Sequence, residues 1–161
     1  MNNELPGLVA SLGKDSRVQD LLNRVCALTG MGFAAVAYVS ETRWIACQVE
    51  DRIAFGLRPG DELEIKKTIC DEIRDSGQAI AIDDTANDPD WWGHPVPTLY
   101  GFRSYVSLPI VIEGEFFGTL CAIDDAPRER PFKLILSELE RMAQELGALL
   151  RPKLLEQSLP N

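Results

Sequence analysis

The chain has 161 residues, 45% of them hydrophobic and 25% charged, which is enough apolar material for one domain with one core and no disulfide staples. Sixteen basic residues against 25 acidic ones give a formal net charge of −9. Such an acidic surface repels nucleic-acid backbones and anionic lipid headgroups, so the composition argues against nucleic-acid and membrane partners.

The first half of the chain is predicted to contain a helix and three strands. Asp15 or Ser16 would cap the helix, apolar residues recur after it at helical spacing, and Gly30 would end it. Helical spacing is also present in residues 1–14. The strands are expected over residues 33–40, 44–50 and, more weakly, 53–57.

The second half is predicted to contain a helix over residues 65–76, a short strand over 79–82 and a long polar loop over 83–97. The clearest hairpin follows, with strands over residues 103–113 and 116–124. A last helix begins near Pro131, and Pro152 is expected to kink or end it because its ring clashes with the preceding turn.

Two residues of this hairpin predict features of its backbone. Pro109 has no N–H to donate, so its strand must lie at an edge or a bulge there. Gly118 lies inside the returning strand, where glycine marks a close approach of another backbone. Alternation on a period of two places Tyr105, Ser107 and Pro109 on one face of the sheet.

The segment Gly101–Asp125 resembles the C-terminal half of GAF domains. It reads GFRSYVSLPI and then GEFFGTLCAID, which matches a strand ending in a Pro-aliphatic pair, a Gly turn and an hGhLxhxD strand. Upstream, GQAIAIDD at 77–84 matches the preceding step of the family pattern. The resemblance implies an α+β, PAS-related fold, in which a central antiparallel sheet of five to six strands carries the terminal helices on one face. A short helix and a long loop would cover the other face.

This resemblance also divides the chain and implies a function. Residues 1–14 would be a helical extension, 15–150 the GAF domain, and 151–161 a tail or linker. GAF domains are sensory modules of bacterial-style signalling proteins, and they bind cyclic nucleotides, bilins, haem or small metabolites between the sheet and the long connection. We therefore expect a non-catalytic domain that binds a small molecule or a partner.

Aromatic residues cluster in that connection and suggest the wall and lid of a pocket. The alternative is a loop that its aromatic side chains pin onto the sheet. Arg103 could contact an anionic ligand, or it could pair with Asp83 or Asp84 and hold the loop. The candidate ligand-binding residues are Trp91, Trp92, His94, Tyr100, Phe102, Arg103, Tyr105, Ser107 and Cys70.

Family members that carry a covalent bilin have a Cys-His pair in the connection, whereas this chain has Trp92-Gly93-His94 and no cysteine there. Covalent bilin is therefore not expected, and the cofactor is unknown. Free methionine sulfoxide reductases are an alternative within the family, and Cys70 matches one of their cysteines. Their catalytic cysteine is replaced here by Pro95-Val96-Pro97, so no catalytic residue is assigned.

The four cysteines form no CxxC or CxxH pair, and the aspartates of the polar loop lack the EF-hand pattern, so no metal site is expected. Without a signal peptide or a long apolar run, we expect reduced, mostly buried thiols and a cytoplasmic location.

The last helix has an apolar heptad stripe that allows two interpretations. It could pair with a second copy and lead to an output domain, in the same or another chain, of a histidine kinase or a cyclic-dinucleotide signalling protein. It could instead pack on its own sheet, and both could hold together. We expect a homodimer; a ligand-free dimerisation module is a further alternative. The stripe consists of Ile135, Leu139, Met142, Leu146 and Leu149.

Overall fold

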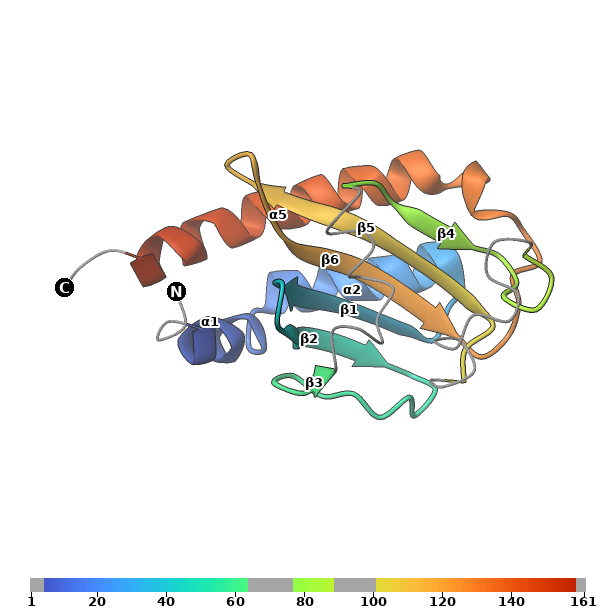
Figure 1. The fold of residues 1–161 in the computed structure, drawn as a ribbon, viewed down its shortest axis with the longest axis horizontal. Coiled ribbons are helices and arrows are strands. Elements are labelled where there is room, and N and C mark those ends of the chain that lie inside the picture. The colour runs from blue at the N-terminus through green and yellow to red at the C-terminus, as the bar shows by residue number, and fades with distance from the viewer. Residues whose placement is uncertain (1–4, 64–76, 89–100, 159–161) are drawn as a thin grey trace.

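The computed structural model describes residues 5–63, 77–88 and 101–158. One antiparallel sheet has the strand order β3-β2-β1-β6-β5-β4, and helices pack along one of its faces (Figure 1). The strands are β1 Phe33–Val39, β2 Trp44–Asp51, β3 Glu62–Leu63, β4 Ile80–Ile82, β5 Ser104–Ile112 and β6 Glu115–Asp124. The helices are α1 Leu5–Leu12, α2 Ser16–Thr29, the 3-10 turn η2 Phe132–Leu134 and α5 Leu136–Ser158. The predicted α+β fold is confirmed.

The main core lies between the sheet and the helices α2 and α5. Val106, Leu108 and Ile110 of β5 point into it, together with the buried stripe of α2. Tyr105 belongs to a separate cluster on the opposite face, as the period-two pattern predicts. The terminal helices therefore cover one face, as expected. The predicted helix over 65–76 and most of the 83–97 loop lie outside the described residues.

Helix α2 begins and ends where its capping residues predict. The Asp15 carboxylate accepts hydrogen bonds from the backbone N–H groups of Arg17 and Val18, at 2.8 and 3.4 Å. Gly30 ends the helix with a φ of 72°, a conformation that glycine adopts at little cost.

The predicted strand over 53–57 is wrong, because the Asp51 carboxylate turns the chain there. It accepts hydrogen bonds from the backbone N–H groups of Ile53, Phe55 and Gly56 at 3.2, 2.9 and 2.9 Å. These bonds take the place of hydrogen bonds to a neighbouring strand. Burial acts to raise the pKa of Asp51, but these hydrogen bonds outweigh it and lower the pKa. The apolar residues still pack on the sheet, so their alternation reports burial on one side without a strand.

The β5–β6 hairpin confirms the prediction for Pro109 and Gly118. Pro109 lies beyond the last β4 contact, at Ser107, and next to a register shift between Ile110 and Val111. Gly118 pairs with Tyr38 of β1, and a Cβ at Gly118 would lie 1.8 Å from the Ala37 carbonyl oxygen. The two backbones therefore meet at a distance that only glycine permits.

Helix α5 continues through Pro152 to Ser158. Of the two expected effects of Pro152, a kink or an end of the helix, the end is therefore wrong. The next residue anchors this part of the helix. Lys153 Nζ lies 3.0 Å from Ser11 Oγ and 3.1 Å from Asp15 Oδ2. Contacts with the junction of α1 and α2 thus hold α5 beyond the proline, which a local helix rule does not include. Among the described residues, no helix combines the length and apolar character that a membrane span requires.

The apolar stripe of α5 packs on its own sheet. Leu139 and Leu146 are fully buried and Met142 is 7% exposed, while Ile135 and Leu149 pack against the same core cluster. The interpretation in which the stripe covers the sheet accounts for all five residues within one chain. A homodimer is not tested by a single chain and stays a prediction.

Asp15 makes the stability of the fold depend on pH. Burial acts to raise its pKa, but hydrogen bonds from Arg17 and Lys153 lower it to about 2, from 3.8. Because the folded-state pKa is the lower one, the contribution of Asp15 is complete above pH 3.8 and is lost as the pH falls through 2. We expect Asp15→Asn to cost ~1–2 kcal/mol at pH 7 and little at pH 2.

Urea unfolding at both pH values measures this difference. Asp20→Asn is the matched control, because Asp20 is an exposed residue of the same helix. An equal loss for Asp15→Asn at both pH values would contradict the assignment of the charge.

Candidate functional site

The face of the sheet away from α2 and α5, called the second face below, is built from apolar side chains with a small-residue centre. At one end, the rings of Phe102 and Tyr105 lie 5.3 Å apart, beside Phe33 and Ile82. At the other end lies a cluster of Val39, Trp44, Ala37 and Ala46. All of these side chains are buried.

Strand register places the small residues side by side between the two ends. Ser107 pairs with Cys121, which pairs with Ala35. In the next row, Pro109 pairs with Thr119, which pairs with Ala37 and through it with Ala46. The bulky side chains therefore flank a floor of small ones.

Asp51, opposite Phe33, is the acidic register position on this face, and its carboxylate is occupied by the backbone N–H groups of residues 53, 55 and 56. The other positions are uncharged, so most of the face favours an uncharged molecule. From β4 to β2, these uncharged positions include Ile80, Ile82, Tyr105, Ser107, Pro109, Thr119, Cys121, Ile123, Phe33, Ala35, Ala37, Val39, Trp44, Ala46 and Val49.

Arg103 lies at the start of β5 and pairs with Asp84. Its Nε and Nη2 atoms lie 3.1 and 2.8 Å from Asp84 Oδ1. The hydrogen bond from Arg103 lowers the pKa of the Asp84 carboxyl. The structure supports the second interpretation of Arg103, in which this residue pairs with Asp84 and holds the loop after β4. Asp84 also accepts from the Ala86 N–H at 3.1 Å, as in an Asx-type turn.

Asp83, the neighbour of Asp84, contacts the start of the last helix instead. Its Oδ1 accepts the Phe132 N–H at 2.8 Å, and its carbonyl accepts the Arg128 N–H at 2.8 Å. The Arg128 guanidinium lies 4.5 Å from the centre of the Phe132 ring and donates to the Thr29 carbonyl. Phe132 is 1% exposed, so the loop after β4 is attached to a buried anchor of η2 and α5.

Asp124 and Ser104 complete this group of contacts. The Asp124 carboxylate accepts from Gly32 N at 2.8 Å and Ala126 N at 2.9 Å, and Ser104 Oγ donates to the Ala126 carbonyl at 2.8 Å. We call the contacts of Asp83, Asp84, Arg103, Asp124 and Phe132 the strand-end network. It joins the start of β5, the end of β6 and the start of η2.

The structure brings together three of the nine predicted ligand residues on one face. Phe102, Tyr105 and Ser107 lie on the second face, whereas Arg103 belongs to the strand-end network. Sequence reasoning missed Trp44, Thr119 and Cys121, although the alternation in β2 and β6 is the signal that places them on this face. Trp91, Trp92, His94, Tyr100 and Cys70 lie outside the described residues.

Three cysteines are described, and all are buried. Cys26 and Cys47 lie in the core under the helices. Burial raises the pKa of Cys26 and raises that of Cys47 to about 12, which disfavours a thiolate. Cys121 lies on the second face. Within the described part of the chain, no cluster of histidine, cysteine and carboxylate side chains could hold a metal ion.

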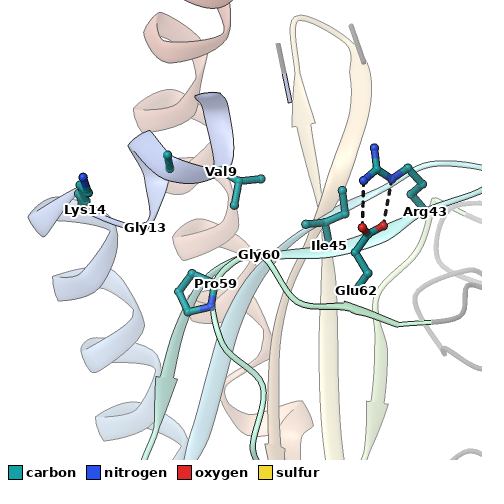
Figure 2. Close-up of a pocket in the computed structure, with 9 residues that line it drawn as sticks. Val9, Gly13, Lys14, Arg43, Ile45, Pro59, Gly60 and Glu62 are labelled. Carbon is teal, nitrogen blue, oxygen red and sulfur yellow. Dashed lines mark hydrogen bonds and ion pairs between the residues drawn. The ribbon is translucent and has the colours of Figure 1, made fainter. Parts of the chain in front are cut away.

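A separate pocket of about 510 Å³ lies between α1, the start of β2 and the turn at Pro59. Figure 2 shows Arg43 and Glu62 facing each other on one side of it, with two contacts of 3.0 Å. Val9, Ile45 and Pro59 make it mainly apolar. Because Arg43 and Glu62 pair with each other, neither charge is left unpaired for a ligand in this pocket.

The GAF domain family model matches residues 14–151, a range that includes the whole sheet, α2 and most of α5. The chain belongs to the GAF domain family. A search of curated proteins found no match.

Solved structures agree with this family. The GAF domain of an Acinetobacter phosphoenolpyruvate-protein phosphotransferase has a TM-score of 0.65 at 11% identity, over 92% of this chain and 90% of that one. The PixJ GAF domain of Thermosynechococcus elongatus, in its blue-light absorbing form, has 0.68 at 15%, over 98% and 94%. A type II free methionine-R-sulfoxide reductase from Thermoplasma acidophilum has 0.66 at 12%, over 89% and 94%. At these identities the likeness concerns the fold, which sensors and an enzyme share.

Proposed function

We propose that this GAF domain is a non-catalytic sensory domain that binds a small molecule on the second face and transmits binding to α5. The observation that carries the proposal is the strand-end network. Asp84 holds Arg103 at the start of β5, and the adjacent Asp83 holds Phe132 at the start of η2. A ligand-induced change at the start of β5 would therefore reach the terminal helix through two neighbouring residues.

Transmission needs two arrangements of the network that a ligand can bias. Phe102 and Tyr105 line the second face on either side of Arg103 and Ser104, so a ligand against these rings would act on the segment that the network fixes. Asp83 contacts η2 through a single backbone N–H at Phe132, a bond that can break without unfolding the sheet.

The experiment is hydrogen exchange on the full chain, with any metabolite that raises its melting temperature. We expect binding to protect residues 102–107 and to change exchange at residues 132–139. In Asp83→Ala, the protection of β5 should remain and the response of α5 should be lost. Asp125→Ala is the matched control, because Asp125 is an exposed aspartate between β6 and η2 and takes no part in the contacts of Asp83 and Asp84 described above. A wild-type response of α5 in Asp83→Ala would contradict the proposed transmission.

A reductase is the alternative within the family, and the described cysteines give it little support. Cys26 and Cys47 are buried under the helices with raised pKa values, so neither favours the nucleophilic thiolate that the reaction needs. Turnover of free methionine-R-sulfoxide with a thiol reductant tests this alternative directly. Activity that is lost in Cys70→Ser or Cys121→Ser would overturn the non-catalytic assignment.

We further propose that α5 passes the signal to an output domain of a histidine kinase or cyclic-dinucleotide protein, in the same or another chain, in the cytoplasm. A homodimer is part of this proposal. Since the apolar stripe of α5 is buried in its own chain, the second copy would contact the polar outer surface of α2 and α5. Arg24 and Glu145, paired at 3.0 Å, lie on that surface.

A further inference from the structure

Trp44 has a buried hydrogen-bond donor without an acceptor. It is the first residue of β2, pairs with Val39 and Leu63, and is 3% exposed. Among the described residues, its indole Nε1 is the one buried side-chain nitrogen or oxygen that makes no hydrogen bond. Buried tryptophan N–H groups usually have a partner, so this exception needs a reason.

Leaving such a donor unpaired destabilises the fold relative to a bonded one. The neighbours of the ring explain why it lacks a partner within the chain. Ala37, Val39 and Ala46 surround it, with Leu57 and Phe116 packed against the same cluster, and these side chains have no acceptor. The donor therefore lies in an apolar environment, where one added hydrogen bond would be strong.

Trp44 lies beside the small-residue floor of the second face. Ala37 and Ala46 belong both to the cluster of Trp44 and to the row that continues through Thr119 and Pro109. Trp44 and its partner Val39 form the adjacent row on the same face, so a molecule lying on the first row would be next to Trp44. The cluster around Trp44 contains no acidic or basic side chain. Asp51, the acidic register position on this face, is opposite Phe33 at the other end, so a charged molecule would be costly to bury beside Trp44.

We infer that the indole N–H of Trp44 donates a hydrogen bond to the ligand of the second face, and that this ligand is uncharged, largely apolar and presents a carbonyl-type acceptor toward β2. The inference rests on the proposed ligand-binding function and adds the chemical class of the ligand. The probes that represent this class are indanone, a flat bicycle with one carbonyl, and indane, the same bicycle without it.

The test follows the indole N–H signals of the 15N-labelled full chain by NMR, with Trp44→Phe used to assign the Trp44 signal. Indanone should move that signal downfield, and indane should bind without this shift. A net hydrogen bond of about 0.5–1.5 kcal/mol corresponds to a roughly two- to twelve-fold weaker binding of indanone to Trp44→Phe, whereas the affinity for indane should be unchanged. Benzothienylalanine at position 44, which keeps the ring shape without the N–H, replaces Trp44→Phe if that variant does not fold.

The outcomes separate this inference from the proposed function. If both probes bind the second face and Trp44→Phe affects them equally, the inference is overturned and the ligand-binding function stands. If the Trp44 signal already lies at the downfield position of a bonded N–H without a probe, the inference is likewise overturned. If neither probe perturbs second-face residues at millimolar concentration, the assigned ligand class is wrong, while a metabolite that shifts those residues would still support the function.

Discussion

Gly118→Ala is expected to destabilise the fold by about 3 kcal/mol or more, at the upper end of the range for overpacking. The new methyl group would lie 1.8 Å from the Ala37 carbonyl oxygen and 2.9 Å from the carbonyl carbon. Both atoms belong to the backbone of β1, which lies between β2 and β6 in the sheet. Relief would therefore require β1 to move away from β6. Thermal and urea unfolding of the purified chain measure the loss.

Gly32→Ala is the matched control for this prediction. Its new methyl group would also be crowded, at 2.2 Å, but against the Cγ2 atom of Ile53, which is the end of a side chain that can rotate. We expect a much smaller loss of stability than for Gly118→Ala. Equal melting temperatures for the two variants would show that the β1–β6 contact is not the tight one.

Leu139→Ala and Leu146→Ala are each expected to cost about 2–5 kcal/mol of unfolding free energy, because both side chains are fully buried against the sheet. The loss should be the same at micromolar and at hundred-micromolar protein, since the contacts lie within one chain. Gln144→Ala is the control, because Gln144 is an exposed residue of the same helix, and its effect should stay within about 0.5 kcal/mol.

Protein concentration decides between the two interpretations of the α5 stripe. If the stripe instead forms the interface of a homodimer, the wild-type melting temperature will rise with concentration, and the two leucine variants will lose that dependence. Sedimentation at the same concentrations reports the oligomeric state independently. A dimer that persists in both variants would agree with an interface on the polar surface of α2 and α5.

Local chemistry made the hairpin and the helix boundaries predictable. Pro109 and Gly118 each violate a rule for strand interiors, and each violation has one structural solution, an edge beside a bulge and a close backbone contact. Asp15 and Gly30 satisfy helix ends through neighbours within four positions. Such features depend on residues close together in the chain, so they can be read before the fold is known.

Asp51 shows a limit of prediction from local sequence patterns. The alternation of Ile53, Phe55 and Leu57 predicts a strand, and these residues are packed on one side as alternation requires. The structure satisfies the backbone N–H groups of Ile53 and Phe55 with the Asp51 carboxylate instead of a neighbouring strand. Periodicity reports which side is apolar, but it does not report where the backbone hydrogen bonds go.

By itself, the sequence determined the GAF fold, the face that Tyr105 and Ser107 share, and the apolar stripe of α5. Only the tertiary structure decided that the stripe covers its own sheet, that Arg103 pairs with Asp84, that Asp83 reaches Phe132, and that Trp44 keeps an unpaired donor. The physical reason is the separation along the chain of the residues that interact. Burial patterns and caps arise from neighbours along the chain, whereas Asp83 and Phe132 are 49 positions apart and meet only after the sheet has formed.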